Sequence, residues 1–147
     1  MSRVEIVKAF AAALDAQDFE KAGSYLADDF VLQGPSPEPL GKQAFLAVQR
    51  AFQSAFPDWS FNSHDEVEQG DTVRSTVQVT GTHTRELVAP LPGLPPIPAT
   101  NKHVSLPDEH LVFTFKDSTI ASLTSDNPPG GGILGVLAQI GVPVPQM

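Results

Sequence analysis

Two basic side chains, His83 and Arg85, occupy positions where the sequence pattern predicts buried residues. In the segment 72–86, every second residue is small or apolar, in the order Val73, Ser75, Val77, Val79 and Gly81. This alternation is typical of a β-strand with one buried face, and continuing it carries His83 and Arg85 onto that face. A histidine there could bond to the oxygen atoms of a ligand or could be a core residue satisfied by a neighbouring hydroxyl.

Glu109 and His110 are adjacent ionisable residues at the start of another expected strand. Successive side chains of a strand point to opposite faces, so only one of the two can face the interior. Glu109 shares its face with Leu111 and Phe113, whereas His110 shares a face with Thr114. The count of apolar neighbours therefore favours Glu109 as the inward residue.

Asp126 ends the last expected strand and precedes Asn127-Pro128. A carboxyl group that lines an apolar cavity has its charged form disfavoured, so its pKa rises and it can exchange protons near neutral pH. The same three residues are also typical of the start of a loop, because Asp and Asn side chains bond to nearby backbone. Both interpretations are compatible with the residues alone.

The composition limits what such groups could act on. The 147 residues include 9 Lys and Arg against 17 Asp and Glu, which gives a formal net charge of −8. An acidic chain repels phosphate backbones, so nucleic acid is not an expected partner. Cysteine is absent, which excludes thiol catalysis and disulfides. No apolar run reaches the roughly 18 residues of a membrane helix, so we expect a cytoplasmic protein without membrane contact.

Other catalytic motifs fail on spacing. Gly130-Gly131-Gly132 follows two prolines instead of joining a strand to a helix, so it does not resemble a phosphate-binding loop. No serine lies in a nucleophile elbow. The histidines and acids lack the short spacings typical of metal ligands, so no metal is expected.

The periodicity of the apolar residues predicts helices followed by a sheet. Helices are expected over about 3–14, 19–27 and 42–55. A capping box formed by Ser2 and Glu5 starts the first helix, and Pro57 ends the third. A short strand is expected at 30–32, and further strands over about 59–69, 72–86, 102–116 and 119–126. This order indicates an α+β fold with an antiparallel sheet.

Two irregular segments interrupt the pattern. The segment 87–99 contains five prolines among apolar residues, which predicts a stiff connection, a lid over an apolar pocket, or a polyproline ligand. Near the C-terminus, 128–132 precedes a short apolar helix expected over 133–140, and the tail after it is too rich in proline to continue that helix.

Three strings of residues carry a resemblance to a known family. They are Ala55-Phe56-Pro57-Asp58-Trp59, Gly81-Thr82-His83-Thr84 and Pro98-Ala99-Thr100-Asn101-Lys102. In their order and spacing the chain resembles the SnoaL-like polyketide cyclases of the nuclear transport factor 2-like superfamily, over about 4–140. The resemblance implies a nuclear transport factor 2-like cone, with N-terminal helices packed in a curved, mainly antiparallel sheet, and a single domain over 1–147.

The resemblance also implies an activity. Cyclases of this family close a ring by an intramolecular aldol reaction without a metal or cofactor, and an aspartate near the end of the last strands acts as acid and base. Asp126 matches that aspartate. His110 matches a histidine that touches substrate oxygens, so on this ground we expect His110 to face the cavity, against the count of apolar neighbours.

The remaining expectations concern the ligand and the assembly. A hydrophobic carbonyl compound is the substrate that the resemblance implies, and a homodimer is the expected assembly. The residues expected to line the substrate site are Phe56, Trp59, His83, Arg85 and Glu109, although Phe56 and Trp59 are also typical core residues.

Two alternatives stay open, because this fold hosts several functions. The chain could be a non-catalytic small-molecule-binding protein or structural dimer. It could also be an epoxide hydrolase or dehydratase, which needs a second acid, and Glu109 facing inward beside Asp126 would favour that activity. The insertion of 128–132 after the matching aspartate departs from the family pattern, so the substrate does not transfer directly.

Overall fold

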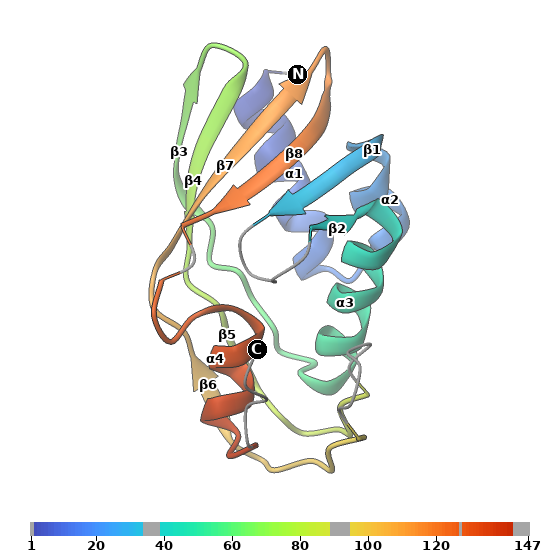
Figure 1. Ribbon diagram of the computed structural model, residues 1–147, viewed down its shortest axis with the longest axis vertical. Helices are drawn as coiled ribbons and strands as arrows, with labels where there is room; N and C mark the ends of the chain where they lie inside the picture. The colour runs from blue at the N-terminus through green and yellow to red at the C-terminus, as the bar shows by residue number, and fades with distance from the viewer. Residues whose placement is uncertain (1, 34–38, 89–94, 127, 143–147) are drawn as a thin grey trace.

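The computed structural model describes residues 2–33, 39–88, 95–126 and 128–142 (Figure 1). Its helices are α1 (Arg3–Asp15), α2 (Phe19–Ser24), α3 (Lys42–Ala55) and α4 (Gly132–Gln139). Its strands are β1 (Leu26–Gln33), β2 (Leu40–Gly41), β3 (His64–Gln69), β4 (Thr72–Val77), β5 (Thr80–Thr82), β6 (His103–Ser105), β7 (Glu109–Lys116) and β8 (Thr119–Ser125). None of the helices in these ranges is long and apolar enough to cross a bilayer.

The helix boundaries follow local sequence signals at α1 and α3. The Ser2 side chain accepts a hydrogen bond from the Glu5 backbone at 3.1 Å, and the Glu5 side chain accepts one from the Ser2 backbone at 3.2 Å. This confirms the capping box. α3 occupies the predicted range, and ends where Pro57 prevents its continuation.

Strand pairing shortens α2 and lengthens β1 relative to the predictions. α2 stops at Ser24, and β1 begins at Leu26, where Leu26 pairs with Ile120 of β8. The Ile120 backbone N–H also donates to the Tyr25 carbonyl at 2.8 Å. These contacts are distant in sequence, so the helical periodicity could not reveal them.

Six strands form a curved sheet in the order β2-β1-β8-β7-β4-β3, and β5 and β6 form a second, two-stranded sheet. All the pairings are antiparallel except the parallel pairing of β1 with β8. In Figure 1, α1 lies behind the six-stranded sheet, and α3 extends toward β5, β6 and α4 at the other end. The α+β fold with a mainly antiparallel sheet is thus confirmed.

The expected long strand over 72–86 is divided. β4 ends at Val77, and the chain then pairs with a different segment through Ser60 and Thr80. Burial nevertheless alternates as predicted as far as His83, which is fully buried. Arg85 is exposed, so its expected place on the inner face is wrong. The reason is local, because the backbone N–H groups of Thr84 and Arg85 turn to the carbonyl of Ala55.

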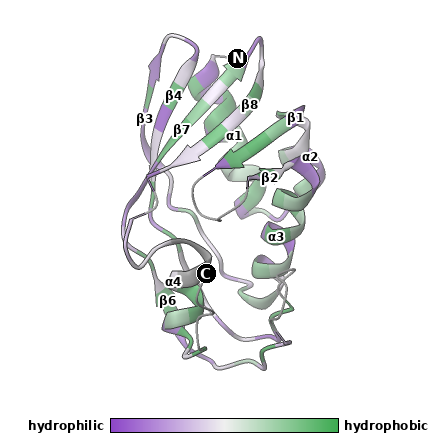
Figure 2. Ribbon diagram, in the orientation of Figure 1, coloured by the Kyte–Doolittle hydropathy of each residue, from purple (hydrophilic) through white to green (hydrophobic). Residues whose placement is uncertain are grey.

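Two hydrophobic cores share α3. The first lies between the six-stranded sheet, α1 and the start of α3, where Phe45 and Leu46 enter it. The second lies between the end of α3, the β5–β6 pair and α4, and contains Phe52 and Leu137. Figure 2 shows hydrophobic residues along α4 and in β7. Phe113 of β7 belongs to the first core and Leu137 of α4 to the second.

The second core also fixes the ends of the segment 87–99. Leu87 and Ile97 pair with each other and are buried in this core. The middle of the segment, 89–94, lies outside the described residues, as does the tail from 143. α4 forms over 132–139, close to its predicted range, and Gln139 holds it to β6 through two hydrogen bonds of 2.9 Å with the Ser105 backbone.

Candidate functional site

A partly enclosed cavity of about 100 Å³ lies in the first core. Its wall is mainly apolar and comes from α1, α3 and the inner face of the six-stranded sheet. The polar residues that line it are Gln49, Ser63, Ser75 and Glu109. Glu109 is therefore the one carboxylic acid among the described lining residues.

Sheet register places Glu109 in this wall. Glu109 is the first residue of β7 and pairs with Val77 of β4. The alternation of side chains along β7 puts Glu109 on the same face as Leu111 and Phe113. All four of these residues line the cavity. The prediction from the count of apolar neighbours is confirmed.

The environment of Glu109 favours its neutral form. The side chain is half-buried, and it accepts a hydrogen bond from the Ser125 hydroxyl of β8. Burial raises the pKa of Glu109, the Ser125 hydrogen bond opposes this shift, and the negative charge of Asp126 adds to it. A carboxyl group in this state can exchange a proton closer to neutral pH than an exposed glutamate.

His110 and Asp126 form a pair away from the cavity. His110 Nδ1 lies 2.9 Å from one carboxylate oxygen of Asp126, and the His110 backbone N–H donates to the other at 3.0 Å. The side chains are 67% and 43% exposed, respectively. The expectation that His110 faces the cavity is wrong, because the alternation that turns Glu109 inward turns His110 outward.

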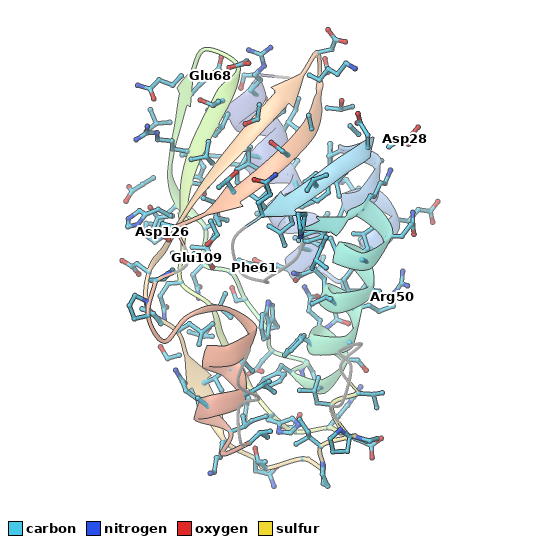
Figure 3. All side chains as sticks on the ribbon, viewed as in Figure 1. Asp28, Arg50, Phe61, Glu68, Glu109 and Asp126 are labelled. Carbon is cyan, nitrogen blue, oxygen red and sulfur yellow. The ribbon has the colours of Figure 1, made fainter. Side chains whose placement is uncertain are left out.

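Asp126 differs from Glu109 in its ionisation. Burial raises the pKa of Asp126, but the hydrogen bonds and charge of His110 outweigh it, and the net shift is downward. Asp126 also accepts a hydrogen bond from the backbone N–H of His110, which is 16 residues away in sequence, so this bond is not the local one typical of the start of a loop. Glu109 and Asp126 lie together at the ends of β7 and β8 in Figure 3.

His83 lies in the surroundings of the second core and does not line the cavity. Its Nδ1 is 2.9 Å from the Thr100 hydroxyl and accepts from the Thr100 backbone N–H at 3.3 Å, while its ring stacks on Phe56 at 5.1 Å. Burial lowers the pKa of His83. Its Nε2 is buried without a hydrogen-bond partner in the described structure.

Phe56 and Trp59 are core residues next to the cavity wall. Both are buried in the second core, with their rings 5.5 Å apart. Trp59 packs edge-on against Phe61 at 6.0 Å, and Phe61 lines the cavity. Figure 3 shows Phe61 between the sheet and α3. The exposed Arg85 is not among the lining residues.

Sequence reasoning missed three polar lining residues. Ser75 could have been found, because it falls on the predicted inner face of its strand. Gln49 and Ser63 carry no comparable signal, since Gln49 lies in a helix of mixed composition and Ser63 precedes β3 in an irregular segment. The described residues contain no group of three side chains arranged to hold a metal ion.

Comparison with known families identifies the chain. The model of the SnoaL-like domain matches residues 7–123. The chain therefore belongs to the SnoaL-like family. None of the curated proteins compared with it matches its sequence.

Solved structures share the fold at low sequence identity. AclR, a proposed hydroxylase from Streptomyces galilaeus, is 18% identical with a TM-score of 0.74, over 95% of both chains. A proposed SnoaL-like polyketide cyclase from Jannaschia sp. CCS1 is 20% identical with a TM-score of 0.72, over 97% of this chain and 93% of that one. IdmH, a proposed polyketide cyclase from Streptomyces antibioticus, is 24% identical with a TM-score of 0.70, over 97% and 100%. These likenesses concern the fold.

Proposed function

We propose that the protein is a cofactor-free acid–base enzyme that acts on a small hydrophobic carbonyl compound, with Glu109 as the proton-transfer group. The observation that carries this proposal is a half-buried carboxyl group with a raised pKa in an otherwise largely apolar cavity. Membership of the SnoaL-like family supports the same class of chemistry, because some solved structures of this fold are proposed polyketide cyclases.

The reaction begins with the carboxylate form of Glu109. It removes a proton from the carbon next to the substrate carbonyl, and the electron pair of that C–H bond forms an enolate. In an isomerisation of an unsaturated ketone whose double bond lies one carbon beyond the deprotonated carbon, the enolate is conjugated with that double bond, and Glu109 returns the proton to the far carbon of the system. In an aldol ring closure, the enolate carbon bonds to a second carbonyl carbon, and the resulting alkoxide takes the proton from Glu109, which returns to its carboxylate form. One negative charge is present on both sides of this transfer, on Glu109 before it and on the enolate after it, and the apolar wall makes the Glu109 carboxylate a stronger base than an exposed glutamate.

Asp126 and His110 enter the proposal differently from Glu109. The family resemblance implies that Asp126 moves the proton and that His110 bonds to substrate oxygens. Asp126 faces away from the cavity, but its charge raises the pKa of Glu109. We therefore assign Asp126 an electrostatic role, with His110 holding its carboxylate. Phe56 and Trp59 support the cavity through Phe61.

A binding function without catalysis is the second candidate. The cavity of about 100 Å³ is smaller than the roughly 300–1,000 Å³ of most ligand pockets, which favours a compact ligand. The described geometry gives less support to an epoxide hydrolase, because the second acid, Asp126, lies on the opposite face from Glu109.

The experiment that tests catalysis is hydrogen exchange at carbon. Acetophenone in deuterated buffer exchanges the hydrogens of its methyl group through the enolate, and NMR follows the loss of the methyl signal. We expect the protein to accelerate this exchange and Glu109→Gln to lower the catalysed rate by about 100-fold. We expect Asp126→Asn to keep most of the rate.

The same experiment separates the alternatives. If Asp126→Asn abolishes exchange and Glu109→Gln does not, the proton passes through Asp126. If acetophenone binds but neither the protein nor its variants accelerate exchange, the cavity is a binding site. Asp28→Asn is the control, because Asp28 is an exposed residue of β1 distant from Glu109 (Figure 3).

A further inference from the structure

A row of hydrogen-bonded side chains connects the cavity to Glu66 of β3. Ser75 lines the cavity and is 3% exposed, and its hydroxyl oxygen lies 3.2 Å from that of Ser63. The Ser63 hydroxyl donates to Glu66 at 2.8 Å. The acid–base chemistry proposed above does not use this row.

The charge of Glu66 gives the row a direction. An ionised carboxylate only accepts hydrogen bonds, so the Ser63 hydrogen is committed to Glu66. The Ser63 oxygen is then the acceptor of this pair, and the Ser75 hydroxyl donates its hydrogen to it. What remains of Ser75 on the cavity side is a lone pair, and each hydrogen bond in such a row strengthens the next.

Gln49 adds an acceptor from the opposite wall. It lines the same cavity from α3, and its Oε1 is buried without a hydrogen-bond partner in the described structure. A buried polar atom without a partner costs free energy, so a ligand with a donor at this place gains by pairing with it.

Ser75 and Glu109 are diagonal neighbours on the inner face of the sheet. Ser75 pairs with Leu111, and Glu109 lies two residues before Leu111 on the same strand. Diagonal neighbours lie about 7–8 Å apart, with their Cβ atoms somewhat closer. The cavity thus carries an acid–base group, Glu109, and a hydrogen-bond acceptor, Ser75, which are separated by about the length of a small molecule.

We propose that Glu66, acting through Ser63 and Ser75, makes the cavity select carbonyl compounds that carry a hydroxyl group. The carbonyl end of the ligand lies at Glu109, and the hydroxyl donates to Ser75. Glu66 is a positioning residue in this arrangement, since it touches Ser63 and not the ligand. The inference rests on the proposed function, because it assumes that the cavity binds a carbonyl compound.

The test compares two ligands of nearly equal size. 4-Hydroxyacetophenone carries the hydroxyl, and 4-methylacetophenone replaces it with a methyl group. Calorimetry gives the dissociation constant of each. We expect the protein to bind the hydroxyl compound about tenfold more tightly, because a hydrogen bond to a charge-terminated acceptor supports it.

Three variants assign that preference to the row. Glu66→Gln replaces the carboxylate with an amide that can donate to Ser63, so the direction of the hydrogen bonds in the row is no longer fixed. We expect the preference for the hydroxyl compound to fall to less than about threefold, a loss of roughly the size of one neutral hydrogen bond. Ser63→Ala interrupts the row and has the same effect. Glu68→Gln keeps the tenfold preference, because Glu68 is an exposed residue near the turn of the β3–β4 hairpin (Figure 3), two residues beyond Glu66 on the same strand.

A spectroscopic signature separates this role from a structural one. A phenol that donates toward a carboxylate-terminated row absorbs at longer wavelength than the same phenol in water, so the bound hydroxyl compound shows a red-shifted band that Glu66→Gln and Ser63→Ala remove. Thermal unfolding of each variant shows that it is folded.

The outcomes distinguish failure of this inference from failure of the proposed function. If both ligands bind equally well, or if Glu66→Gln and Ser63→Ala keep the preference and the red shift, the selection by Glu66 is wrong and the carbonyl site stands. If neither ligand binds at millimolar concentration, the proposed carbonyl site itself is wrong, and the inference is overturned with it.

Discussion

Glu109 and Asp126 lie at the ends of neighbouring strands on opposite faces of the sheet, and the charge of Asp126 adds to the rise that burial causes in the pKa of Glu109. The carboxylate of Asp126 is held by His110 outside the cavity, while Glu109 faces the apolar interior. One acid thus stays ionised and influences the protonation of the other across the sheet.

Replacing Asp126 by Asn removes that charge. We expect the pKa of Glu109 to fall, so that the acid limb of the exchange reaction with acetophenone moves to lower pH. Carbon-13 NMR of the glutamate carboxyl groups measures the shift directly. The pKa of Glu109 in Asp28→Asn should equal that of the unmodified protein, and an unchanged titration in Asp126→Asn would contradict the electrostatic role.

Replacing Ser125 by Ala acts in the opposite direction. The Ser125 hydroxyl bonds to Glu109 and lowers its pKa, which burial otherwise raises. Without this donor we expect the pKa of Glu109 to rise further and the pH profile of exchange to move to higher pH. The same NMR titration checks it. A fall in the pKa would show that Ser125 stabilises the neutral acid instead.

Glu109→Gln should stabilise the fold at neutral pH. The pKa of Glu109 is raised in the folded state, so its favourable contribution to folding is complete below the ordinary glutamate pKa and is lost as pH rises through the folded value. Gln stays neutral throughout. We expect the variant to unfold at a higher temperature than the unmodified protein at pH 7, and with no advantage at about pH 3, where both side chains are neutral.

A homodimer through the outer face of the six-stranded sheet is a further proposal. Val67 of β3 is 56% exposed at this sheet, a large apolar residue in solvent. Sedimentation of the protein should give about twice the chain mass of 15.7 kDa. We expect Val67→Lys to shift the equilibrium to monomers, whereas Val88→Lys, at a residue equally exposed but outside the sheet, leaves dimers intact. Monomers alone in the unmodified protein would refute the dimer.

The sequence predicted those elements whose signals are local. The capping box at Ser2 and the proline after α3 act within one helical turn, and the expected boundary between the strands over 59–69 and 72–86 falls between β3 and β4. Strand ends that depend on pairing with segments distant in sequence were not predictable. The division of the strand after Val77 depends on pairing between Ser60 and Thr80, which no local pattern encodes.

The site was predictable in part, and for a physical reason. Alternation alone turned Glu109 inward, because a strand has only two faces and the apolar neighbours identify the buried one. The resemblance to the cyclases pointed to His110 instead. Ser63 lies in an irregular segment directly before β3, and its place depends on tertiary contacts with Ser75 and Glu66.

The sharing of α3 between the two cores has a consequence for how the molecule opens. Its first turns pack against the six-stranded sheet, and its last turns pack against the β5–β6 pair and α4. Because α3 is one continuous helix with residues in both cores, we expect it to open as a single unit, so that its amide hydrogens share one degree of protection from exchange. A ligand that enters beside Gln49 should slow exchange at Ala55 as well, although more than one helical turn separates them.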